Sequence, residues 1–64
     1  MQLSITERKE KILQMLMDDN SVSVTNISEK LGVTVVTARS DLAALEGEGF
    51  LVRTHGGAVP SRHP

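Results

Sequence analysis

The chain of 64 residues has no cysteine, no tryptophan and no tyrosine, and Phe50 is its one phenylalanine. Without cysteine it forms no disulfide and offers no thiolate to zinc. With so few aromatic rings it does not fit modules that stack single-stranded bases or RNA on exposed aromatic side chains. No hydrophobic run approaches the ~18 residues of a membrane span, and no basic-then-apolar signal opens the chain. The length of 64 residues predicts one small domain with a thin core. The lack of a membrane span and of a signal predicts that this domain is soluble and cytoplasmic.

The first predicted helix covers residues 6–18. It carries apolar side chains at helical spacing, which are Ile5, Ile12, Leu13 and Leu16. Two start signals compete, because Thr6 can act as the N-cap or Ser4 and Glu7 can form a capping box. The residues themselves leave both starts open.

A second and a third helix follow, separated by a tight turn. Residues 22–24 alternate like a very short strand, and Thr25 is predicted to cap a second helix that ends at Gly32 in the left-handed conformation. Thr34 is predicted to cap a third helix over about residues 35–48. This helix has a stripe suited to burial, at spacings of four and three residues, formed by Ala38, Leu42 and Leu45.

The end of the chain predicts a β-hairpin. Residues 50–53 favour a strand, residues 55–57 form a turn, and residues 58–59 can pair back until Pro60 ends the strand. The order helix, short strand, helix, turn, helix, hairpin predicts a mainly α fold with a small β-hairpin, a winged helix-turn-helix of three helices plus a wing. We expect the domain to cover residues 1–59, with residues 60–64 as a frayed tail or the start of a linker.

Charge is distributed unevenly over these elements. Lys and Arg number 7 against 8 Asp and Glu, a net charge of −1, whereas DNA-binding domains usually carry a basic surplus. The distribution over faces decides, however. Residues 33–40 carry Arg39 and no acid, and the small and hydroxylated side chains that open the third helix let it enter the major groove of DNA. We therefore expect DNA binding of modest affinity that needs a dimer.

Three separated motifs resemble the N-terminal DNA-binding domain of DeoR-family bacterial transcriptional regulators. The first is a basic residue followed by aliphatic residues four and eight positions on, and the second lies on the third helix. The third is the His-Gly-Gly-Ala sequence of the wing. The matching residues are Arg8, Ile12, Leu16, Thr34, Thr37, Ala38, Arg39, Asp41, Leu42, His55, Gly56, Gly57 and Ala58. One position departs from the family pattern, because Ser40 stands where a second basic residue is usual.

The resemblance implies a sequence-specific double-stranded DNA-binding module of a repressor. It also implies a C-terminal domain, absent from this chain, that binds a sugar phosphate or a related metabolite, and a full-length protein that is a homo-oligomer at the nucleoid in the cytoplasm. No cofactor and no metal is expected. No catalytic constellation occurs among the residues, so the chain is not expected to be an enzyme.

Candidate contacts lie at the start of the third helix. Thr34 can bind a phosphate, helped by the helix dipole, or serve as an N-cap alone. Val35 and Val36 suit thymine methyl groups, unless one of them packs on the second helix, which is the stronger alternative for Val36. Thr37 is either a phosphate or base contact or an inert surface residue. Ser40 suits a minor backbone contact.

Arg39 is the leading candidate, because arginine can bind a guanine edge or a phosphate through two donors. The alternative is an ion pair with Asp41 or with an acid of the first helix. We expect Asp41 to be structural, paired with Arg8 or another base.

The remaining candidates are Thr25, Arg53, His55 and Gly56. Thr25 either touches a phosphate or only caps its helix. The Gly-rich tip of the hairpin can approach the minor groove closely because it lacks side chains, while His55 can equally be a solvent-exposed turn residue. The rival function from another class is a winged helix that binds a protein partner and not DNA.

Overall fold

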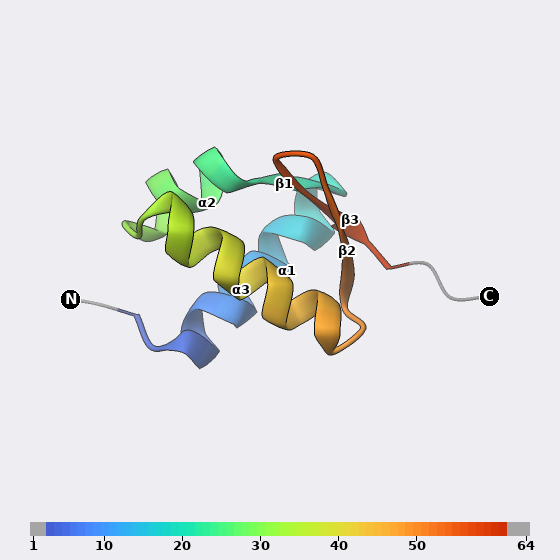
Figure 1. The fold of residues 1–64 in the computed structure, drawn as a ribbon, viewed down its shortest axis with the longest axis horizontal. Helices are drawn as coiled ribbons and strands as arrows, with labels where there is room; N and C mark the ends of the chain where they lie inside the picture. The colour runs from blue at the N-terminus through green and yellow to red at the C-terminus, as the bar shows by residue number, and fades with distance from the viewer. Residues whose placement is uncertain (1–2, 62–64) are drawn as a thin grey trace.

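The computed structural model describes residues 3–61 of the chain. Three helices and three short strands follow one another as α1 (Ile5–Asp19), β1 (Val22–Ser23), α2 (Val24–Leu31), α3 (Val35–Gly47), β2 (Leu51–Thr54) and β3 (Gly57–Pro60). Figure 1 shows α3 lying across α1, with the hairpin of β2 and β3 rising at the C-terminal end of α3. The predicted winged helix-turn-helix is confirmed.

Local hydrogen bonds decide where α1 begins. The Ser4 hydroxyl accepts from the Glu7 amide at 3.1 Å, and the Glu7 carboxylate accepts from the Ser4 amide at 3.0 Å. This capping box is the second of the two predicted starts, so Thr6 is not the N-cap. The hydrogen bond from the Ser4 backbone amide, followed by that from the Ser4 side chain, lowers the pKa of Glu7. Ile5, predicted on the apolar stripe, is half-exposed because it precedes the first full turn that faces the core.

The prediction that Thr25 caps α2 is wrong. The N-cap is Ser23, whose hydroxyl accepts from the Asn26 amide at 3.0 Å. Val24 is therefore the first residue of α2 and not the end of a strand. Its side chain is buried, and its amide donates to the Gly56 carbonyl at 2.8 Å. Because of this contact with the hairpin, α2 begins two residues earlier than its local sequence predicts.

The other helix ends agree with their sequence signals. Gly32 ends α2 with φ of 68°, in the left-handed region. Thr34 is the N-cap of α3, and its hydroxyl accepts from the Thr37 amide at 3.1 Å. The helix ends at Gly47, with Glu48 as the C-cap.

The sheet has three antiparallel strands in the order β1-β3-β2. In the pairing of β2 with β3, Leu51 lies opposite Pro60 and Thr54 lies opposite Gly57. In the pairing of β1 with β3, Val22 lies opposite Ala58 and Ser23 lies opposite Gly57. The sequence predicted the hairpin but not the addition of β1 to its inner strand. As predicted, the returning strand stops at Pro60, which has no N–H to donate. Of the predicted tail, residues 62–64 lie outside the described residues.

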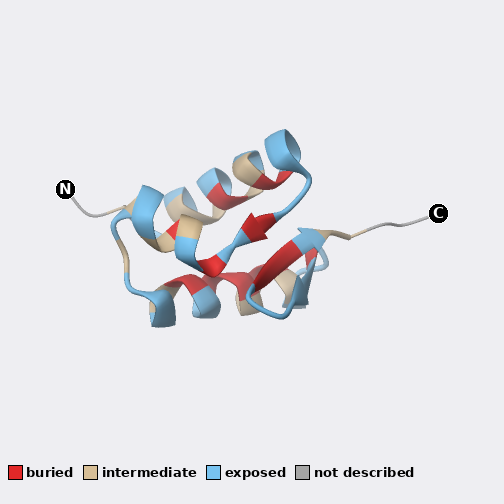
Figure 2. Ribbon diagram, turned by 90° about the horizontal axis from the view of Figure 1, so that it is seen from above, coloured by how far each residue is buried: buried red, intermediate tan, exposed pale blue. Residues whose placement is uncertain are grey.

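The core lies where α1, α2, α3 and the sheet meet, and Figure 2 shows the buried residues of these elements facing one another. Its members are aliphatic: Ile12, Leu16, Val22, Val24, Ile27, Ala38, Leu42, Leu45, Leu51 and Ala58. The predicted stripe of α3 is confirmed in full. Because one face of α3 is committed to this core, its other face is fixed outward beside the wing.

Candidate nucleic-acid interface

An ion pair on the inner side of α3 determines which face of this helix points outward. The Arg8 guanidinium on α1 donates to both carboxylate oxygens of Asp41, from Nε at 2.6 Å and from Nη2 at 3.1 Å. The Asp41 side chain is 1% exposed, and the hydrogen bonds to it raise the pKa of Arg8. Of the partners foreseen for Asp41, the structure thus selects Arg8. This pair fixes the rotation of α3 and removes its central acid from the outer surface.

Apolar and hydroxylated side chains form the first turn of α3. Val36 is 76% exposed and Val35 is 39% exposed. The alternative that Val36 packs on the second helix is therefore wrong, because the buried stripe begins only at Ala38. Two neighbouring methyl-bearing side chains face solvent at the start of the helix.

The hydroxyl groups of Thr34 and Thr37 are linked. Thr34 Oγ1 donates to Thr37 Oγ1 at 3.1 Å while it accepts from the Thr37 amide. A hydroxyl that accepts in this way can still direct its own hydrogen elsewhere. Thr37 can therefore donate to an outside acceptor such as a phosphate. The amides of Val35 and Val36, in the first turn, have no partner within the helix.

Arg39 follows on the same outer side and is exposed, as is Ser40. Arg39 makes no ion pair within residues 3–61. The alternative that Arg39 pairs with Asp41 or with an acid of the first helix is therefore wrong, because Arg8 already occupies Asp41. Its guanidinium is available to an external anion.

The wing is anchored to the rest of the domain at its tip. The turn holds His55 and Gly56, both exposed, and Gly56 has φ of 88°. The Gly56 carbonyl accepts from the Val24 amide at the start of α2. Thr25, the next residue of α2, is exposed beside this contact. The wing tip and the first turn of α2 therefore form one continuous edge.

A second ion pair joins the wing to α3. The Glu46 carboxylate accepts from the Arg53 amide at 2.8 Å and from Arg53 Nε at 3.0 Å. These hydrogen bonds, the one from the backbone first, lower the pKa of Glu46. Glu46 was foreseen only as an acid at the end of the recognition helix. Its pairing with Arg53 depends on where the hairpin lies against α3, which no local signal reveals.

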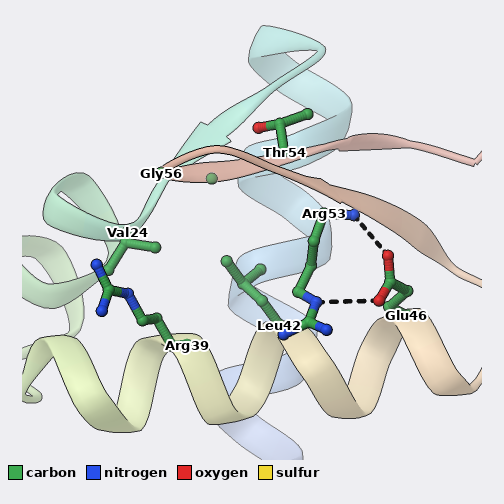
Figure 3. A pocket seen from close by; sticks show the side chains of 8 residues that line it. Val24, Arg39, Leu42, Glu46, Arg53, Thr54 and Gly56 are labelled. Carbon is green, nitrogen blue, oxygen red and sulfur yellow. Dashed lines mark hydrogen bonds and ion pairs between the residues drawn. The ribbon is translucent and has the colours of Figure 1, made fainter.

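Arg39 and Arg53 line one hollow of about 320 Å³ between α3 and the wing. Figure 3 shows Arg39 reaching toward Val24 from α3, and Arg53 reaching from the wing toward Leu42 and Glu46. Two cationic side chains from separate elements thus flank one concave surface. Within the described part of the chain, this is where the structure brings the predicted helix and wing contacts together.

The acids around α3 are each held by a base. Asp41 pairs with Arg8, Glu46 with Arg53, and Glu48 with Lys9 at 2.6 Å. The first half of α3, residues 35–40, has no acid at all. The net charge of −1 therefore does not describe this face, which carries an unpaired Arg39.

Within residues 3–61, no group of three His, Asp or Glu side chains is arranged to hold a metal ion. None of the described helices is long and apolar enough to cross a membrane.

The chain is similar to known proteins along most of its length. The model of the DeoR-like helix-turn-helix domain matches residues 8–62. The chain is 51% identical over 51 residues to the lactose phosphotransferase system repressor of Lactococcus lactis subsp. lactis, covering 80% of this chain and 20% of that protein. It is 48% identical over 54 residues to a putative aga operon transcriptional repressor of Escherichia coli O157:H7, covering 84% of this chain and 20% of that protein.

An activator is also among the relatives. The L-fucose operon activator of Haemophilus influenzae is 40% identical over 55 residues, which cover 86% of this chain and 22% of that protein. The chain thus spans about a fifth of the length of the relatives it matches. No solved structure matches it. Since the family model covers most of the chain, the chain belongs to the DeoR-like helix-turn-helix domains.

Proposed function

We propose that this chain is the operator-binding module of a transcriptional repressor, with α3 in the major groove and the wing at the flanking minor groove. One observation carries the proposal most directly. The outer face of the first half of α3 has exposed apolar, hydroxyl and arginine side chains and no acid. A slim, acid-free helix face with one unpaired guanidinium suits base edges and phosphates at close range.

The residues divide by the kind of contact they suit. Thr34, Thr37 and the first-turn amides suit phosphates, which also gain from the helix dipole. Val35 and Val36 suit thymine methyl groups, and Arg39 suits a guanine edge or a phosphate. Ser40, the residue after Arg39, suits a minor backbone contact.

The wing and α2 extend the surface to the flank. His55 and Gly56 suit the minor groove, because the exposed tip has little side-chain bulk. Arg53 suits the phosphates beside the hollow, and Thr25 suits a phosphate at the adjoining edge. Most of the affinity then comes from phosphate contacts, so binding is expected to fall steeply as salt rises.

The whole regulator is proposed to extend beyond this module. Residues 1–59 form the DNA-binding domain, and residues 60–64 lead toward a C-terminal effector domain that binds a sugar phosphate or a related metabolite. The full-length protein is a homo-oligomer that acts at the nucleoid. Repression is supported by the similar proteins that are named as repressors, although an operon activator is similar as well.

Arg39→Ala tests the module directly. If Arg39 contacts a base edge, the substitution is expected to cost about 1–3 kcal/mol of binding and to leave the melting temperature nearly unchanged, since Arg39 has no partner to lose within residues 3–61. Binding is measured by fluorescence anisotropy on duplex DNA from upstream of the protein's own gene.

The matched control is Lys11→Ala, which removes the same charge from the exposed side of α1. Equal losses of affinity for the two variants would assign Arg39 to the general electrostatic attraction alone. A fall in melting temperature for Arg39→Ala would instead give Arg39 a structural role.

A further inference from the structure

Glu46 is an acid that lies on the proposed DNA-binding surface. It lines the hollow between α3 and the wing together with Arg39 and Arg53. A carboxylate placed there repels phosphates. Electrostatics alone therefore predicts that removing Glu46 strengthens DNA binding.

The hydrogen bonds that Glu46 accepts predict the opposite result, that removing Glu46 weakens DNA binding. One carboxylate oxygen accepts from the backbone amide of Arg53, and the other accepts from its Nε. The first bond ties the outer strand β2, which is an edge of the sheet, to α3. The second holds the guanidinium at its inner nitrogen.

The outer nitrogens of Arg53 are left for another partner. Nη1 and Nη2 make no hydrogen bond within residues 3–61. A guanidinium has five N–H donors in a fixed plane, so the bond at Nε leaves four of them unused. A long, exposed side chain without such a bond would sample many rotamers, and a bound phosphate would have to select one of them.

We propose that Glu46 is a positioning residue, which holds Arg53 and the wing strand so that Nη1 and Nη2 present a preformed site for a DNA phosphate at the hollow. This inference rests on the proposed function, since it assigns a ligand to Arg53. The benefit of a fixed guanidinium exceeds the repulsion from a carboxylate whose charge Arg53 already neutralises.

The test is a double-mutant cycle measured as duplex affinity at low salt. Glu46→Ala is expected to weaken binding about two- to tenfold, the cost of ordering one long side chain on binding. In an Arg53→Ala background the same substitution is expected to leave affinity unchanged or to raise it, because no guanidinium is left to position and the carboxylate is no longer neutralised. Glu46→Gln, whose amide oxygen still accepts one of the two N–H groups, is expected to lose less than Glu46→Ala.

Glu48→Ala is the control for charge. It removes an acid two residues along that pairs with Lys9 and does not line the hollow, and it is expected to bind as tightly as wild type or slightly more tightly. Three results would overturn the role of Glu46: tighter or unchanged binding by Glu46→Ala, an equal loss in both backgrounds, or an equal loss for Glu48→Ala. A wild-type chain that fails to bind the duplex at low salt would instead contradict the proposed function itself.

Discussion

Gly57→Ala is expected to destabilise the domain by at least about 3 kcal/mol, enough to unfold much of a chain this small. A Cβ atom built at Gly57 would lie 2.0 Å from the Val22 carbonyl oxygen and 3.1 Å from the Cα of Ser23. Both obstacles are backbone atoms of β1, so no side-chain rotation can relieve the clash. Relief would require β1 to separate from β3, and α2 begins directly after β1.

The neighbouring glycine provides the control. Gly56 has φ of 88° but open space around its Cα, so Gly56→Ala is expected to cost only the left-handed backbone penalty of about 1–2 kcal/mol. Urea denaturation followed by circular dichroism measures both variants. Similar stabilities for the two would contradict the close packing of β1 against Gly57.

Asp41→Ala is expected to cost about 2–3 kcal/mol of folding stability and to lower the melting temperature by at least about 10 °C. It deletes two hydrogen bonds to Arg8 and a carboxylate that is 1% exposed. Arg8 would be left partly buried with its charge uncompensated, which is the costly result of breaking such a pair.

Glu48→Ala makes a matched comparison, because Lys9–Glu48 also joins α1 to α3 with an N–O distance of 2.6 Å. Glu48 is 46% exposed, however, and exposed pairs contribute about 0–1 kcal/mol. Thermal melts of the two variants at neutral pH separate burial from ion pairing as the cause. Equal shifts in melting temperature would show that Asp41 is not the anchor that orients α3.

Much of the fold could be predicted because its signals are local. The left-handed end at Gly32, the Thr34 cap and the stripe of Ala38, Leu42 and Leu45 each depend on residues within one or two turns. Periodicity and capping chemistry describe such features well. They also predicted correctly that the first half of α3 turns an acid-free face outward.

The errors arise where distant segments meet. Ser23 and Thr25 are both plausible caps by local chemistry, and the choice depends on the Val24 amide reaching Gly56, 32 positions later in the chain. The two wing glycines look equivalent in sequence, yet only Gly57 is pressed against β1. The Glu46–Arg53 pair likewise depends on how the hairpin lies against α3. Tertiary contacts of this kind override local propensity.

We propose that the outer face of α3, the start of α2 and the wing tip form one surface for duplex DNA. The most direct measurement is a map of backbone amide chemical shifts during titration with the duplex at low salt. Shifts are expected to be confined to Thr25, residues 34–40, Arg53 and the His55–Gly56 turn, and to decline as salt is raised. An absence of shifts at low salt, or shifts centred on the exposed apolar side chains of Met17 and Phe50, would contradict it.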